Sequence, residues 1–209
     1  MKESEGEVVR EYVPIDERSI HGVTFDGKLV WFARDDELVA FDPESEKVVQ
    51  RHAIPAADAG TAFDGAHIYQ LAHGEILVID PKSGVVERKL PAPGKGEATG
   101  MAWSDGYLWI GQYSGKKIHK VDAKTGEVVK TLATDRFVTG VSCVGGALWH
   151  GSIGEGKSPE LRRLASDGTV VESISVAVGK ISGVERTPKG EFWCGGENGK
   201  LRLVRPRVS

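Results

Sequence analysis

The sequence predicts an all-β fold, because one short pattern returns five times along the 209 residues. Each copy begins with a variable residue, a glycine and a residue suited to a strand: His21-Gly22-Val23, Ala59-Gly60-Thr61, Thr99-Gly100-Met101, Thr139-Gly140-Val141 and Ser182-Gly183-Val184. Successive glycines are 38, 40, 40 and 43 residues apart. A period near 40 built of short strands is typical of a β-propeller with one blade per repeat. We therefore predict a five-bladed β-propeller with four-stranded antiparallel blades.

Four strand-like runs fill each repeat. In the first repeat they cover residues 22–25, 29–32, 38–43 and 47–52, and apolar and polar residues alternate along them. Glycine turns follow the third run in later repeats, at 81–84, 123–126 and 166–168. The second run always carries a large aromatic residue: Trp31, Tyr69, Trp109, Trp149 or Trp193. We expect these rings to pack adjacent sheets, since each buries on the order of 150–250 Å².

The two ends of the chain are predicted to close the ring. A Val-Val pair marks the fourth run of the first four repeats, and another pair, Val8-Val9, precedes the first repeat. The last repeat stops after its third run, at 201–204. The N-terminal strand is therefore expected to complete the C-terminal blade, which removes an exposed sheet edge. Residues 1–209 would then form a single domain, because a blade cannot bury both of its faces alone.

Composition narrows the expected partners. A net charge of −3 provides no positive electrostatic potential that would attract nucleic acid or anionic lipid. No apolar run approaches membrane-spanning length, and the polar N-terminus does not resemble a signal peptide. The two cysteines form no C-x-x-C motif, so we predict no metal site from them. We expect a cytoplasmic monomer that binds neither nucleic acid nor membranes.

The candidate site comes from positions that should lie near the ring axis and that differ between repeats. One such position precedes each glycine, and others follow each aromatic residue by three or four places. The packing positions stay alike while these vary, which predicts an asymmetric axial pocket for a small polar or anionic molecule. The predicted ligand-binding residues are Arg34, Thr99, Gln112, Tyr113, Thr139, Ser152 and Ser182.

His21 is the candidate catalytic residue, because imidazole titrates near neutral pH and other repeats place Ala, Thr or Ser there. Arg34 belongs to the same repeat, and a cation beside an imidazole suggests an anionic ligand. The structural alternatives are a hydrogen-bonded histidine at the channel mouth and an arginine paired with Asp35 or Asp36. The secondary candidates are His150, His73 and Glu197.

The repeat at 100–112, followed by residues 117–126, resembles the streptogramin (virginiamycin B) lyase family of propellers. The resemblance implies an acid–base histidine, a glutamate and a bound magnesium, on seven blades. His21-Gly22-Val23 and Trp31-Phe32-Ala33 match two parts of that motif, but Arg34 occupies the glutamate position. Because a positive charge there disfavours a divalent cation, we predict no cofactor.

The chain also resembles, more distantly, the plant-type glutaminyl cyclases, or glutamine cyclotransferases, whose propeller has five blades. Their motif has Gln-Gly at the first strand and an acidic residue just after the aromatic of the second. Here His21-Gly22 and Phe32 occupy these positions. Our main hypothesis is a lyase-like propeller that binds a small metabolite, as a divergent lyase if it is an enzyme. The alternatives are a protein-interaction scaffold and a divergent glutaminyl cyclase-like acyltransferase.

Overall fold

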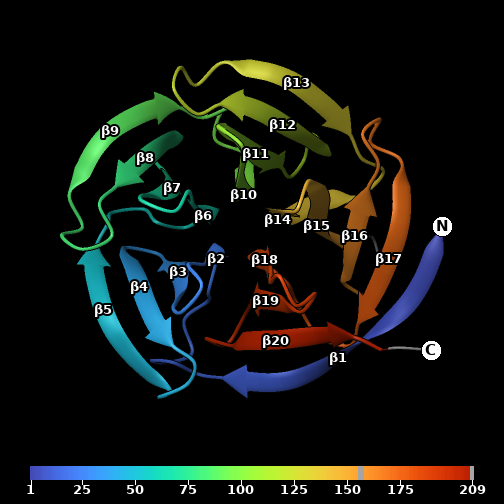
Figure 1. Cartoon of the computed structure of the whole chain (residues 1–209), viewed down its shortest axis with the longest axis horizontal. Helices are drawn as coiled ribbons and strands as arrows, with labels where there is room; N and C mark the ends of the chain where they lie inside the picture. Colours follow the sequence, from blue (N-terminus) through green and yellow to red (C-terminus); the bar gives the residue numbers. More distant parts are fainter. Residues whose placement is uncertain (155–157, 208–209) are drawn as a thin grey trace.

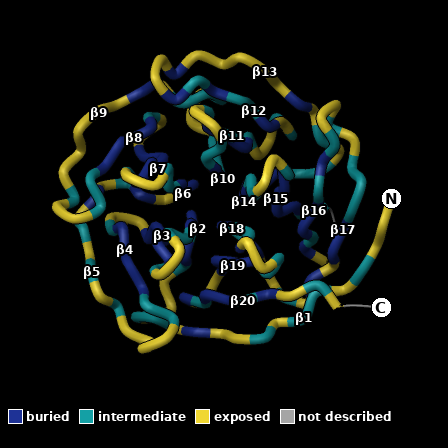
Figure 2. The backbone as a smooth tube through the Cα atoms, in the orientation of Figure 1, coloured by how far each residue is buried: buried dark blue, intermediate teal, exposed yellow. Residues whose placement is uncertain are grey.

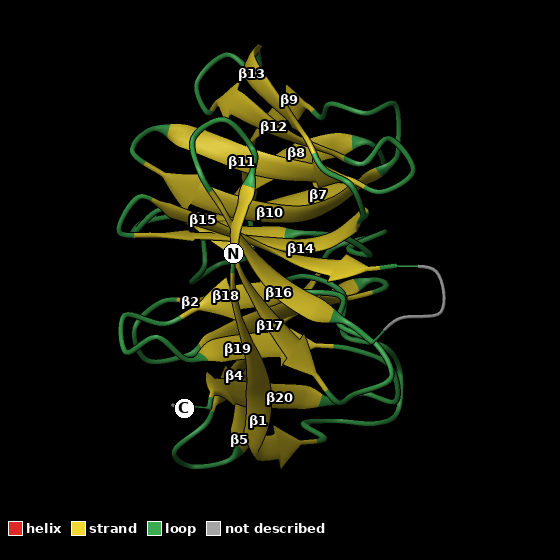
Figure 3. Ribbon diagram, turned by 90° about the vertical axis from the view of Figure 1, so that its right-hand side faces the viewer, coloured by secondary structure: helices red, strands yellow, loops and turns green. Residues whose placement is uncertain are grey.

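A ring of β-sheets surrounds a central axis in the computed structural model, which describes residues 1–154 and 158–207 (Figure 1). The first strand of each repeat lies nearest the axis, and the last forms the rim of the ring (Figure 1). A side view shows the strands crossing the molecule with loops on both of its faces (Figure 3). Within these ranges the chain forms strands and turns, and no helix is long and apolar enough to cross a membrane.

Three of the sheets contain four antiparallel strands each, in sequence order from the axis to the rim. The first consists of β2 (Val23–Phe25), β3 (Val30–Arg34), β4 (Glu37–Asp42) and β5 (Lys47–Ala53). The second consists of β6 (Thr61–Phe63), β7 (Ile68–Ala72), β8 (Glu75–Ile79) and β9 (Val86–Pro91). The third consists of β10 (Ala98–Ser104), β11 (Tyr107–Gln112), β12 (Lys117–Asp122) and β13 (Val128–Ala133). The predicted all-β class and the four runs per repeat are confirmed here.

The remaining strands form one eight-stranded sheet in the order β14-β15-β16-β17-β1-β20-β19-β18. Its first half consists of β14 (Phe137–Val144), β15 (Ala147–Ile153), β16 (Glu160–Leu164) and β17 (Val170–Val176). Its second half consists of β18 (Val184–Arg186), β19 (Phe192–Gly195), β20 (Leu201–Pro206) and the N-terminal strand β1 (Lys2–Tyr12). Both halves run from the axis to the rim, and they meet along β17 and β1 (Figure 1).

Strand β1 pairs with two different partners. From Gly6 to Tyr12 it runs antiparallel to β20, which confirms the predicted pairing of the N-terminal strand with the C-terminal one. From Lys2 to Gly6 it runs parallel to β17, a pairing that the repeat pattern did not predict. Charged pairs support the antiparallel half, where Arg202 Nε lies 2.8 Å from Glu11 Oε2. Because β1 has 11 residues and β20 has 6, the excess length reaches β17.

The recurring glycines lie where the innermost strands of neighbouring sheets come closest. A Cβ atom at Gly60 would lie 2.4 Å from the amide nitrogen of Met101, and one at Gly100 would lie 2.4 Å from that of Val141. Gly22 and Gly140 make the same kind of approach to the next repeat. A Cβ at Gly183 would lie 2.5 Å from the carbonyl oxygen of His21, so the contacts return to the first repeat. The glycine recurs because no side chain fits at this radius.

The core lies between adjacent sheets, and the outer strands are the exposed ones (Figure 2). Four of the five repeat aromatics are at most 5% exposed: Trp31, Tyr69, Trp149 and Trp193. The Tyr69 ring stacks on Trp103 of the next sheet, with ring centroids 5.5 Å apart. Trp109 is half-buried and lies under the ammonium group of Lys120. Trp109 also packs against a core cluster that joins its own sheet to β14 and β15, so the predicted packing role is confirmed for all five rings.

Candidate functional site

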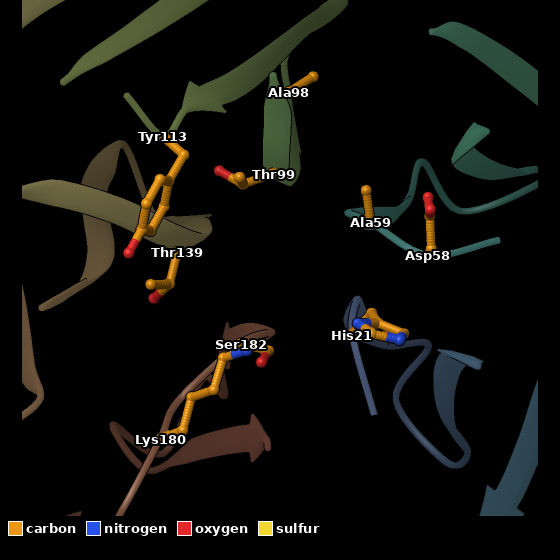
Figure 4. A pocket seen from close by; sticks show the side chains of 9 residues that line it. All are labelled: His21, Asp58, Ala59, Ala98, Thr99, Tyr113, Thr139, Lys180 and Ser182. Carbon is orange, nitrogen blue, oxygen red and sulfur yellow. The ribbon is translucent and has the colours of Figure 1, made fainter. Parts of the chain in front are cut away.

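A cavity of about 170 Å³ opens around the axis, where the innermost strands begin (Figure 4). Its lining residues are His21, Asp58, Ala59, Ala98, Thr99, Tyr113, Thr139, Lys180 and Ser182. All five residues that precede a repeat glycine are among them. The close approach of the glycines fixes this position against the axis, which is why the repeat alignment could locate it. The structure thus brings together five predicted site residues: His21, Thr99, Tyr113, Thr139 and Ser182.

His21 enters the cavity from the segment that leads into β2. Its backbone N–H donates to the carbonyl of Ala33 over 3.0 Å, which fixes the residue against β3. Its imidazole Nε2 lies 3.2 Å from Asp35 Oδ1, in the turn between β3 and β4. The carboxylate fixes the orientation of the ring. A histidine oriented in this way has the chemistry of a proton acceptor and donor.

Three residues with aliphatic hydroxyl groups also line the cavity: Thr99, Thr139 and Ser182. Thr99 Oγ1 donates to the carbonyl of Val138 over 3.0 Å. Thr139 Oγ1 and Ser182 Oγ are buried and have no hydrogen-bond partner in the described part of the chain. Because neither oxygen has accessible surface, both face away from the open space of the cavity, and Thr139 Oγ1 lies toward Gly151 of β15. Tyr113 keeps its ring at the cavity by stacking on Phe137, with centroids 4.8 Å apart.

Two charged residues of the cavity were missed by sequence reasoning. Asp58 comes from the segment between β5 and β6, and Lys180 from the segment between β17 and β18. Figure 4 places them on opposite sides of the cavity, with Asp58 beside Ala59 and Lys180 beside Ser182. Both lie within three residues of a repeat glycine, and this is the signal that could have found them. The linkers before the repeat glycines differ in length, however, so Asp58 and Lys180 fall at different positions when the repeats are aligned.

Arg34 does not line the cavity, contrary to the expectation that it would share a site with His21. Its side chain is only 1% exposed, and its guanidinium forms an ion pair with Asp16. The pKa of the Asp16 carboxyl is lowered chiefly by the backbone N–H of Arg18 and also by the two nearby guanidinium groups. Asp16 lies in the segment between β1 and β2, residues 13–22, which is longer than the linkers that join outer to innermost strands elsewhere in the ring. The cation that lines the cavity is therefore Lys180, and not Arg34 as the sequence predicted.

The other predicted residues also lie outside the cavity lining. Gln112 donates to Glu97 over 3.0 Å and bonds to His119, while Ser152 is buried in β15. His150 is fully buried, and burial lowers its pKa to about 4, which keeps the ring neutral. His73 sits in a tight turn with a φ of 52°, and Glu197 is exposed. Gln112, His150 and Ser152 lie on β11 and β15. These are the second strands of their repeats, one strand further from the axis than the innermost strands.

A cluster of metal-binding side chains is absent from residues 1–154 and 158–207. No group of three His, Cys, Asp or Glu side chains there could hold a metal ion. Magnesium requires several oxygen ligands in octahedral geometry. Among its lining residues the cavity has one carboxylate, from Asp58, and a cationic lysine on the opposite side. The magnesium that the lyase resemblance implies does not fit this set of residues.

One buried acid lies close to the inner strands. Glu185 on β18 faces β14, where its Oε2 atom accepts a hydrogen bond from Ser142 Oγ over 3.4 Å. Burial raises the pKa of the Glu185 carboxyl to about 8, and the hydroxyl of Ser142 opposes part of this increase. Since Ser142 Oγ also accepts from the backbone N–H of Arg186, the acid is tied to the junction of the two strands.

Replacing Glu185 with glutamine is expected to remove part of the pH dependence of stability. The folded protein keeps the proton up to about pH 8, whereas the unfolded chain loses it near 4.5. The unfolded state therefore binds fewer protons between these values, and wild-type stability falls as the pH rises through that window. The full increase corresponds to at most about 5 kcal/mol, and partial exposure of the residue reduces this to about 1–2 kcal/mol.

Urea unfolding from pH 4 to 9 checks this expectation. Glu185→Gln should match the wild type at the acidic end and exceed it in stability near pH 8. Parallel curves for the two proteins across the whole range would contradict the assignment of a buried, protonated carboxyl to Glu185.

Known structures resemble this chain in fold, although no protein-family model and no curated protein matches its sequence. The crystal structure of Myxococcus xanthus glutaminyl cyclase superposes with a TM-score of 0.83 at 19% identity, over 100% of this chain and 99% of that chain. Kuenenia stuttgartiensis hydrazine synthase superposes with a TM-score of 0.57 at 16% identity, over 87% of this chain and 57% of that one.

The fold is propeller-like and similar to that of the glutaminyl cyclase. This agrees with the more distant of the two resemblances found in the sequence. Neither a family model nor a sequence match supports the lyase resemblance.

Proposed function

We propose that this chain is a single-domain, five-bladed propeller whose axial cavity carries out acyl transfer on a small amine-bearing substrate, as a divergent relative of the glutaminyl cyclases. The blade count is supported by the glycine contacts, which pass from Gly22 through three further repeats to Gly183 and back to His21. The eight-stranded sheet then counts as two blades that share an edge along β1 and β17.

The observation that carries the proposed reaction is the His21–Asp35 pair at the edge of a cavity rich in hydroxyl groups. When an amine attacks an amide carbonyl within one molecule, the amine loses a proton and the departing ammonia gains one. His21 Nδ1 makes no hydrogen bond to a described residue, while Nε2 faces Asp35. Nδ1 is therefore the atom assigned to accept the first proton and return it.

Release of ammonia from peptides with an N-terminal glutamine tests this reaction. His21→Ala is expected to lower kcat/KM at least about a hundredfold, which is the smaller end of general acid–base contributions. Asp35→Asn should lower it less, because the imidazole remains. The matched control is His73→Ala, since His73 lies in a turn outside the cavity lining and should not affect the rate. Equal rates in the wild type and His21→Ala would contradict the proposal.

A second candidate function is binding without turnover. The observation that favours it is Phe32, fully buried where the cyclase motif has an acidic residue. Without that carboxylate the cavity would retain a ligand and not transform it. A ligand that raises the melting temperature of the wild type in a saturable way, with no ammonia released, would favour this function over acyl transfer.

A further inference from the structure

We infer that the axial cavity selects a free zwitterionic molecule of amino-acid size, with its ammonium group toward Asp58 and its carboxylate toward Lys180. The inference rests on the proposed function only for the location of the site. It goes further in specifying the charges and the size of the ligand.

The two charges that line the cavity are opposite in sign and unpaired. Neither Asp58 nor Lys180 has an ion-pair partner within 4.0 Å among the described residues. By contrast, Asp35 at the same end of the ring is already in contact with His21. Figure 4 shows the two side chains reaching the cavity from opposite sides. A ligand that carries both an ammonium and a carboxylate would satisfy both with charge-assisted hydrogen bonds, whereas a simple anion or cation would leave one unmatched.

The size of the cavity limits the ligand. Its volume is about 170 Å³, whereas pockets for drug-sized ligands measure about 300–1,000 Å³. At about 30 Å³ per water molecule, it holds roughly the volume of five or six waters. One amino acid fits this space, and a longer peptide would have to leave it past the half-exposed ring of Tyr113.

Isothermal titration with three probes tests the inference. L-Glutamine carries both charges, L-glutamine α-amide lacks the carboxylate, and N-acetyl-L-glutamine lacks the ammonium. We expect L-glutamine to bind at least about tenfold more tightly than either analogue, which corresponds to about 1.4 kcal/mol. Lys180→Met should abolish the preference over the α-amide alone, and Asp58→Asn the preference over the N-acetyl compound alone. The matched control, Lys189→Met, changes an exposed lysine outside this cavity and should keep both preferences.

The outcomes separate this inference from the proposed reaction. Preferential binding of L-glutamine without ammonia release from either L-glutamine or glutaminyl peptides would support the zwitterion site and overturn acyl transfer. Ammonia release by a protein that binds all three probes equally would overturn the zwitterion site and leave the reaction standing. Absence of binding by every probe at millimolar concentration would overturn the inference, as would preferences that survive in both variants.

Discussion

Replacing Gly100 with alanine is expected to destabilise the protein by about 3–5 kcal/mol, a large fraction of the stability of an ordinary domain. The new Cβ would lie 2.4 Å from the amide nitrogen of Val141 and 2.5 Å from the carbonyl carbon of Gly140. Both atoms belong to the backbone of the adjacent innermost strand, so no side chain can rotate to make room. The two sheets would have to separate at the axis, where every innermost strand also contacts another neighbour. Urea unfolding monitored by circular dichroism measures the loss.

Gly106→Ala is the matched control for this experiment. Gly106 lies in the turn between β10 and β11 of the same sheet, and a Cβ there would meet no atom within 4 Å. Its φ of +85° makes alanine strained, so a loss of about 1–2 kcal/mol is expected. Equal losses in the two variants would show that the close approach at the axis does not constrain position 100.

The strands could be predicted from the sequence because their signals are local. Alternating residues at 38–43 and the repeated turn glycines depend on a few neighbours, and the same pattern recurs in every repeat. The pairing of β1 with β20 followed from Val8-Val9, which has the composition of a fourth strand. Its parallel pairing with β17 could not be predicted. That contact depends on how far an 11-residue strand extends past a 6-residue partner in the folded ring.

The candidate site was predictable only where the repeat fixes the position of a residue. The residue before each glycine lies at the cavity because only glycine fits where the innermost strands meet at the axis, and His21 was found in this way. Arg34 was misplaced because its partner Asp16 belongs to the long linker 13–22, whose course over the ring the repeat does not specify. Asp58 and Lys180 were missed for a related reason. They lie in linkers of unequal length, whose register against the axis is decided by the folded ring.

Deletion of residues 1–12 is expected to abolish cooperative folding or to leave an aggregating protein. The deletion removes β1, which pairs with both β17 and β20 and so joins the two halves of the eight-stranded sheet. Arg202, whose side chain is 7% exposed, would lose its contact with Glu11. The Tyr12 ring, 5.1 Å from Phe41, would leave a hole beside Trp193. Size-exclusion chromatography and thermal unfolding measure the effect.

A shorter deletion, of residues 1–5, separates the two roles of β1. It removes most of the parallel pairing with β17 and keeps the antiparallel pairing with β20 from Gly6 onward. Because Tyr12 and Glu11 remain, we expect a folded monomeric protein whose melting temperature falls by several degrees, in line with a loss of about 1–2 kcal/mol. An unchanged melting temperature after deletion of 1–12 would contradict ring closure by the N-terminal strand. Collapse after deletion of only 1–5 would instead place the closure in the parallel contact with β17, since that pairing and the contacts between Glu5 and Arg207 are what the shorter variant loses.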